Sequence, residues 1–189
     1  MMGNEFPDSK HSHRRYLIST GDDLSPKHVA AFEKSLEETK EHPGTYDVHV
    51  VTRARRVHQS LLTTPFSALQ SVLDIHKILL TPPKQTSPGS PGSLPDVIFT
   101  NGPATGFFVA FVAYCLKILW VVPDDKMQVL FIESWARVSS LSLTGKLIYY
   151  TGIADMFLVQ HEPVANRYGV LNAGWLVLPP SLRREGGTA

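Results

Sequence analysis

The most constraining feature of this sequence is the stretch Asp96–Arg137, in which two strand-like runs enclose a long apolar one. Asp96–Thr100 is rich in β-branched and aromatic residues, and Met127–Ile132 is a second run of the same kind. Between them, the turn Asn101–Thr105 leads into the apolar run Phe107–Val122. The pattern predicts a buried strand, a tight turn, a helix with proline near its first position, and a second strand.

The turn at Asn101–Thr105 is a candidate anion site. A helix that starts there leaves its first backbone N–H groups unpaired and directed at the turn, which favours a phosphate. Ligands of open parallel sheets bind at the carboxyl ends of the strands. Glu133, Ser134 and Arg137 follow the second strand, so we expect them on the same rim. An ordinary α/β core with ordinary turns fits the spacing equally well.

The remaining segments complete an alternating pattern of about six strands and about four helices. Further strands are expected at 14–20, 46–51, 155–160 and 169–178, and further helices at 26–40, 66–80 and 139–150. This order predicts a mostly parallel sheet covered on both faces, as one Rossmann-like α/β domain over 14–178. The proline-rich segment 81–95 is expected to be a flexible insertion, 1–13 a disordered tail and 179–189 a polar tail.

Two of these helices have a predicted apolar face. The first is expected to begin with Ser25 as N-cap and Pro26 at its first position. Its apolar face is assigned to Val29, Phe32 and Leu36, and that of the second helix to Leu69, Leu73 and Ile75-His76.

A group of arginines follows the strand expected at 46–51. Arg53, Arg55 and Arg56 could hold a phosphate through charge-assisted hydrogen bonds. A basic run is more often a solvated edge, and the sequence leaves both interpretations open.

Composition excludes several classes of function. A formal net charge of +1 argues against bulk electrostatic binding to nucleic acid. The start of the chain is polar and is not a signal peptide. The run Phe107–Val122 carries Lys117 and is shorter than the ~20 apolar residues of a spanning helix, so we expect a helix that is buried on most sides or lies in a bilayer surface. Glycine-rich nucleotide loops, a nucleophile elbow and zinc-ligand spacing are absent from the sequence, which predicts neither a cofactor nor a metal site.

Several blocks of sequence together resemble one known family. They are Pro95–Thr105, Phe131–Val138, Leu141–Leu147 and Asp155–Gln160, preceded by Gly21–Ser25 and Arg53–Ser60. In this order they closely resemble the acceptor-binding, membrane-anchoring subunit of the eukaryotic enzyme that adds the second N-acetylglucosamine to dolichyl-diphosphate-N-acetylglucosamine. The similarity covers roughly residues 14–178, and the insertion at 123–128 resembles the fungal branch.

The resemblance implies one half of a split glycosyltransferase, similar to the bacterial enzyme that makes lipid II. The fold would be the acceptor half of a GT-B glycosyltransferase. A separate catalytic partner would bind UDP-N-acetylglucosamine. This subunit would recruit that partner to the cytosolic face of the endoplasmic reticulum membrane and present the lipid acceptor there, without catalysing transfer alone.

The resemblance also assigns site residues. The acceptor diphosphate would lie at the loop formed by Asn101, Gly102, Ala104 and Thr105, in agreement with the anion site expected above. Glu133 falls where the family keeps an acid facing the interdomain cleft, and is the candidate to orient or deprotonate the acceptor hydroxyl. Further cleft candidates are Ser134, Arg137, Arg53 and Arg55.

Two features depart from the family pattern. The family begins with a membrane-spanning helix and a first strand that ends in Gly-Gly-His-Thr, and neither occurs here, so we expect a form shortened at its start. His161 stands where the family usually has tryptophan. Two rival functions stay open: an independent small hydrolase that uses Ser134 or Glu133, and a truncated paralogue that only binds a partner.

Overall fold

The computed structural model describes residues 13–40, 43–54, 64–83, 94–101 and 104–174. Its contacts divide the chain into two compact units, Met1–Ser93 (unit 1) and Leu94–Ala189 (unit 2). The division falls in the proline-rich segment expected to be an insertion, of which residues 84–93 lie outside the described part. That residues 14–178 form a single domain stays a prediction.

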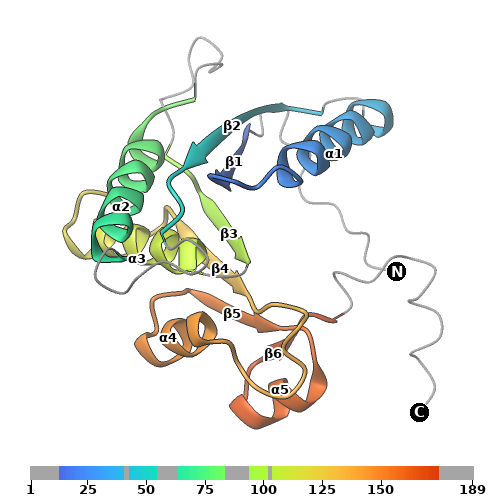
Figure 1. The fold of residues 1–189 in the computed structure, drawn as a ribbon, viewed down its shortest axis with the longest axis vertical. Coiled ribbons are helices and arrows are strands. Elements are labelled where there is room, and N and C mark those ends of the chain that lie inside the picture. The colour runs from blue at the N-terminus through green and yellow to red at the C-terminus, as the bar shows by residue number, and fades with distance from the viewer. Residues whose placement is uncertain (1–12, 41–42, 55–63, 84–93, 102–103, 175–189) are drawn as a thin grey trace. The chain divides into compact units, whose positions relative to one another are not determined.

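Unit 1 is a parallel strand pair with two helices (Figure 1). Its elements are β1 (His13–Ser19), α1 (Ser25–Thr39), β2 (Thr45–Val51) and α2 (Thr64–Leu80). The register of the pair runs from His13 opposite Thr45 to Ser19 opposite Val51. A parallel pair needs a crossover connection, and α1 supplies it. The predicted strands and helices of this half are therefore confirmed, with ends shifted by one or two residues.

The apolar face predicted for α1 is wrong in one position. Phe32 is exposed, whereas Glu33 beside it is buried and 2% exposed. The predicted cap is also wrong, because the Ser25 side chain does not cap the helix. Asp22 does so instead: its carboxylate accepts hydrogen bonds from the backbone N–H groups of Leu24 (3.2 Å) and Ser25 (3.0 Å).

The inward face of α2 also differs from the prediction. Leu69, Leu73 and His76 are exposed, while Ile75 and Leu79 are buried together with Ser71. The buried positions recur every four residues along the helix. The apolar residues of α2 therefore lie on two faces, and the sequence pattern alone does not show which one packs.

Unit 2 is a four-stranded parallel sheet with the order β3-β4-β5-β6. Its elements are β3 (Val97–Asn101), α3 (Ala104–Ile118), β4 (Gln128–Ile132), α4 (Leu143–Thr151), β5 (Met156–Val159), α5 (Glu162–Tyr168) and β6 (Leu171–Asn172). The alternation of parallel strands and helices confirms the Rossmann-like α/β fold. The seven-residue helix α5 was not predicted from the sequence.

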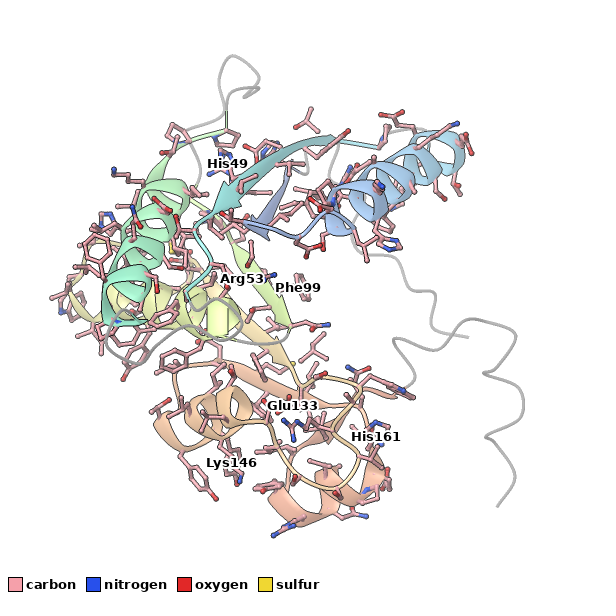
Figure 2. The ribbon with its side chains drawn as sticks, in the orientation of Figure 1. His49, Arg53, Phe99, Glu133, Lys146 and His161 are labelled. Carbon is pink, nitrogen blue, oxygen red and sulfur yellow. The ribbon has the colours of Figure 1, made fainter. Side chains whose placement is uncertain are left out.

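The helices of unit 2 pack on one face of the sheet. α3 contacts β3 and β4, and α5 contacts β5 and β6. On β3, Ile98 and Thr100 are buried, whereas Val97 and Phe99 on the other face are exposed, Phe99 by 63%. Figure 2 shows the Phe99 side chain projecting away from α3. Among the described residues, β3 also has a strand partner on one side only.

α3 ends earlier than its apolar run, which continues to Val122. Trp120 adopts a φ of 57°, and the N–H groups of Trp120 and Val121 donate to the carbonyls of Lys117 (2.9 Å) and Leu116 (3.0 Å). This is the hydrogen-bond pattern of a Schellman motif, with tryptophan where glycine is usual. The Trp120 side chain is 88% exposed. In the described residues no helix is long and apolar enough to span a membrane.

Candidate functional site

The expected rim forms at the carboxyl ends of β3 and β4. Asn101 is the register partner of Ile132, so the residues that follow these two strands emerge side by side. Asn101 is exposed, and Thr105 lies half-buried in the first turn of α3. Ala104 is the first residue of α3, and Gly102 lies outside the described residues.

The start of α3 is held close to the end of β3. A Cβ atom on Gly106 would lie 2.5 Å from the Thr100 hydroxyl oxygen, which is closer than a side chain tolerates. Thr100 is itself buried. Glycine at this position therefore allows the N-terminus of α3 to lie directly over the end of β3.

Glu133, the first residue after β4, is almost completely buried, at 1% exposure. One carboxylate oxygen accepts a hydrogen bond from the Ser134 N–H (2.8 Å). The other accepts from the N–H (3.0 Å) and the hydroxyl (3.1 Å) of Ser142. The Ser142 hydroxyl in turn accepts from the Gly145 N–H at 2.9 Å and caps α4. Glu133 is thus bonded to both ends of the loop 134–142.

Two further side chains tether this loop to the end of β5. The Gln160 amide donates to the Glu133 carbonyl at 2.6 Å. The His161 Nε2 lies 2.6 Å from the Trp135 carbonyl, and the two rings have their centroids 4.5 Å apart. Because a carbonyl only accepts, the His161 Nε2 carries the proton. Figure 2 shows Glu133 and His161 in this part of unit 2.

Of the two site residues expected in the loop 134–142, Ser134 and Arg137, Arg137 is the more exposed to solvent. Its side chain is exposed, and its guanidinium makes no hydrogen bond or ion pair with the part of the chain that the structure describes. Its backbone N–H donates to the Ser134 carbonyl at 3.0 Å and closes a turn. Ser134 is half-buried. The loop therefore presents a cation at the strand-end rim, close in sequence to the buried carboxylate that anchors it.

The arginines expected near the rim belong to unit 1. Arg53 is half-buried just after β2, and Arg55 lies outside the described residues. Hydrogen bonds from Ser25 lower the pKa of Asp22, and the charge of Arg53 adds a smaller effect in the same direction. A contribution of Arg53 or Arg55 to the rim stays a prediction.

Sequence reasoning missed a buried ion pair between α1 and β1. Arg14 donates to the two Glu33 carboxylate oxygens, from Nε at 2.8 Å and from a terminal nitrogen at 2.6 Å. The Tyr16 hydroxyl donates to the same carboxylate. Burial, followed by this hydrogen bond, raises the pKa of Tyr16 to about 12. A glutamate among the apolar spacings of α1 was the only signal in the sequence.

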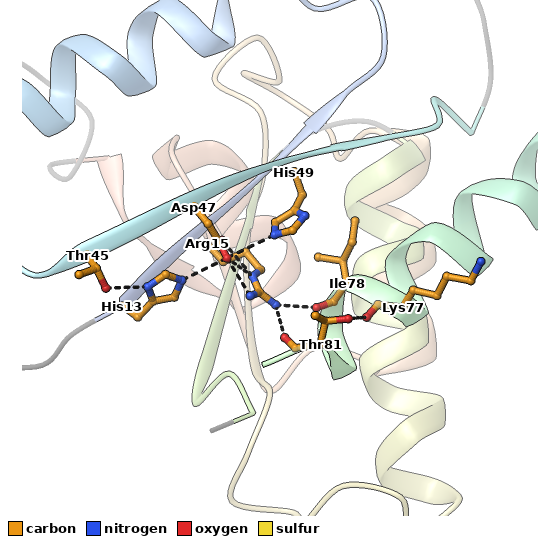
Figure 3. A network of polar contacts seen from close by, with 8 residues as sticks. All are labelled: His13, Arg15, Thr45, Asp47, His49, Lys77, Ile78 and Thr81. Atoms are coloured by element: carbon orange, nitrogen blue, oxygen red, sulfur yellow. Dashed lines mark hydrogen bonds and ion pairs between the residues drawn. The ribbon is translucent and has the colours of Figure 1, made fainter. Parts of the chain in front are cut away.

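A second missed network surrounds Asp47 on the other face of the strand pair (Figure 3). Arg15 binds the Asp47 carboxylate at 2.8 Å and donates to the carbonyls of Ile78 (2.6 Å) and Thr81 (2.7 Å) at the end of α2. His13 and His49 each lie 3.3 Å from the same carboxylate. Arg15 thereby ties β1, β2 and α2 together.

Asp47 should make the stability of unit 1 depend on acidity. Burial raises its pKa, but hydrogen bonds from Arg15 and His49 outweigh this and lower it from 3.8 to about 2. A carboxyl whose pKa is lowered by folding stabilises the fold above its unfolded pKa, and the contribution disappears as the pH falls through the folded one. We expect the free energy of unfolding to fall between about pH 4 and about pH 2. In urea denaturation, Asp47→Asn should remove most of this slope and the exposed Asp23→Asn should leave it; equal slopes in all three proteins would contradict the assignment.

Comparison with known proteins identifies the family. A family model described as "Oligosaccharide biosynthesis protein Alg14 like" matches residues 2–176. Relatives named UDP-N-acetylglucosamine transferase subunit alg14 include that of Schizosaccharomyces pombe, 34% identical over 87% of this chain and 70% of its own length. That of Aspergillus fumigatus is 34% identical over 84% and 87%, and the human protein 28% over 84% and 67%.

No solved structure matches the chain. The resemblance carried by the sequence blocks around the rim is confirmed by these relatives and by the family match, which covers every residue that the structure describes. The chain belongs to the Alg14-like family of oligosaccharide biosynthesis proteins.

Proposed function

We propose that this chain is the non-catalytic subunit of an N-acetylglucosaminyltransferase that adds the second N-acetylglucosamine in N-glycan precursor synthesis. The relatives are named as UDP-N-acetylglucosamine transferase subunits, which supports a role beside a catalytic partner. In this proposal the partner binds UDP-N-acetylglucosamine. The chain recruits it to the cytosolic face of the endoplasmic reticulum membrane and binds dolichyl-diphosphate-N-acetylglucosamine.

The observation that supports an acceptor site most directly is the composition of the rim in unit 2. It combines the start of α3, held over β3 by Gly106, with the guanidinium of Arg137, which has no partner among the described residues. Backbone N–H groups and an arginine fork are both suited to phosphate oxygens. The rim therefore suits a diphosphate, with Asn101, Thr105 and Ser134 as neighbouring polar groups.

The structure offers no support for an independent hydrolase. A serine nucleophile needs a base within hydrogen-bond reach, and in the described part of the chain the Ser134 hydroxyl has no histidine or carboxylate as a hydrogen-bond partner. The Glu133 carboxylate bonds to the Ser134 backbone instead. A paralogue that only binds a partner is separated from the proposed function by the experiment below.

The proposed function predicts transfer only when both subunits are present. The purified chain alone should transfer no sugar from UDP-N-acetylglucosamine to a short-chain prenyl-diphosphate-N-acetylglucosamine, and neither should the partner alone, whereas the mixture should. Steady transfer by the chain alone would contradict the proposal. Binding of the partner without transfer would identify a paralogue that has lost the activity.

Arg137 provides the matched test of the rim within the same assay. Arg137→Ala should raise the KM for the acceptor about tenfold, because a charge-assisted hydrogen bond to phosphate contributes about 1.5–3 kcal/mol. Arg167→Ala makes the same change of charge in the last turn of α5, at the opposite end of the parallel strands, and should leave the KM unchanged. Equal KM values in both variants would remove Arg137 from the acceptor site.

The end of α3 gives a prediction about membrane contact. Four consecutive apolar residues, Ile118–Val121, are exposed. Phe111 is also exposed and lies on the same side of α3 as Ile118. Exposed patches of this kind usually contact a membrane or a protein. We expect the chain to float with phosphatidylcholine vesicles, and Trp120→Gly to reduce flotation.

The same substitution should make the protein more stable, because glycine adopts the positive φ of position 120 without strain. Binding and stability would then change in opposite directions, which a simple folding defect cannot produce. Leu171→Asn removes another exposed apolar side chain and is the control. Unchanged flotation of Trp120→Gly and Phe111→Ser would show that this surface does not contact lipid.

A further inference from the structure

Glu133 closes the loop 134–142 with a single carboxylate. Oε1 accepts from the N–H of the first loop residue, Ser134, at 2.8 Å. Oε2 accepts from the N–H and the hydroxyl of the last, Ser142, at 3.0 and 3.1 Å. The exposed part of the loop, including Arg137, lies between these two anchors. The position of the loop therefore depends on where this carboxylate is held.

The Glu133 carboxylate has little space in which to move or to contact another group. It is 1% exposed. A Cβ atom on Gly145 would overlap Oε2 and lie 3.0 Å from Cδ, so the first turn of α4 leaves no space on that side. The backbone of Glu133 is fixed as well, with its N–H donating to Leu158 (2.8 Å) and its carbonyl accepting from Gln160 (2.6 Å). An acceptor hydroxyl would need to displace these contacts to reach it.

We infer that Glu133 is a positioning residue of the acceptor site, which acts through the loop 134–142 and does not take a proton from the acceptor hydroxyl. This inference rests on the proposed function for the acceptor itself. It replaces the role of general base that the family resemblance suggests for the same residue. All three groups that face the carboxylate are donors, so its chemistry here is that of an acceptor with fixed partners.

Glutamine is not a neutral substitute at this position. Its side-chain amide has one oxygen that accepts and one NH2 group that only donates. In either orientation the NH2 group meets a backbone N–H, that of Ser134 or that of Ser142. Glu133→Gln therefore opens one end of the loop even though it preserves the size of the side chain.

A double-mutant cycle between Glu133 and Ser142 in the two-subunit enzyme tests the inference. Ser142→Ala removes one bond to the carboxylate, and Glu133→Gln should act on the same loop. We expect each variant to raise the acceptor KM several-fold with kcat within about threefold of wild type, and the double variant to be no worse than the poorer single one. Thr144→Ala, two residues into α4, is the control and should behave as wild type.

A general base gives a different result. Removing one typically lowers kcat by about 10²–10⁴, and the loss would add to that of Ser142→Ala. A kcat loss of this size in Glu133→Gln, with additivity in the double variant and a changed pH profile of kcat, would overturn the inference.

Amide hydrogen exchange of the chain alone separates this inference from the proposed function. Loss of a bond to residue 133 should speed amide exchange at Ser134 or at Ser142 by about tenfold or more in Glu133→Gln. The Thr144→Ala variant should show little change at either serine. If the wild-type pair transfers no sugar, the proposed function fails, and the exchange result still decides whether the carboxylate holds the loop. Unchanged exchange at both serines would overturn it.

Discussion

Replacing Gly145 with alanine is expected to destabilise unit 2 by about 3 kcal/mol, although alanine is the better helix former. Gly145 lies inside α4 and its φ is not positive, so helix propensity alone predicts a gain of about 1 kcal/mol. The added Cβ would overlap the Glu133 carboxylate and lie 3.2 Å from the Ser142 hydroxyl. The carboxylate must then move and lose its bonds to the loop, and each such bond contributes about 1.5–3 kcal/mol.

Urea denaturation of the full chain measures this effect. Gly152→Ala is the contrasting variant, because no atom lies within 4 Å of the added Cβ and only the positive φ of 65° opposes it, at about 1 kcal/mol. A Gly145→Ala protein more stable than wild type would show that the Glu133 carboxylate is not held against α4 in solution.

Glu33→Ala is expected to destabilise unit 1 by about 2–3 kcal/mol, a second large effect for a single residue. The Glu33 carboxylate is buried and bonded to Arg14 and Tyr16, so its removal leaves a guanidinium and a phenol without their partner. Loss of one member of a buried pair costs more than the pair itself contributes. Arg14 keeps partial access to water, so the expected loss is smaller than the about 3–5 kcal/mol that removing one member of a fully buried pair costs.

Two comparisons decide whether burial is the cause. Glu37→Ala, on the exposed side of the same helix, should change the free energy of unfolding by less than about 0.5 kcal/mol. The triple variant Arg14→Met, Tyr16→Phe and Glu33→Leu should recover most of the loss, because apolar residues of similar size can replace a buried ion pair. If Glu33→Ala unfolds at the same urea concentration as Glu37→Ala, the ion pair contributes nothing measurable.

Much of the fold could be predicted because strand residues here are strongly apolar and turns are marked by glycine and proline. β3 and β4 were found within one residue of their ends for this reason. The end of α3 could not be predicted. A Schellman motif is normally recognised in a sequence by its glycine, and here position 120 is tryptophan. α5 has seven residues, too few for a helical period to be recognised.

The candidate site was predicted in part for a similar reason. The placement of Asn101 and Glu133 at neighbouring strand ends follows from parallel pairing alone, and the register agrees. The burial of the Glu133 carboxylate depends on Ser142 and Gly145, which are 9 and 12 residues further along the chain and contact it only in the folded protein. Glu33 is the same case in unit 1, since a buried acid is recognised by its partners and not by its spacing.

The side of β3 that has no strand partner among the described residues has a practical consequence for handling the protein. On the side where no described strand pairs with β3, its N–H and C=O groups beside exposed Phe99 offer a template on which another strand can add. Concentrated preparations of the chain should therefore scatter light increasingly with concentration and storage time. A lysine in place of Phe99 would put a charge next to this edge. Charged side chains on edge strands prevent natural sheets from associating edge to edge.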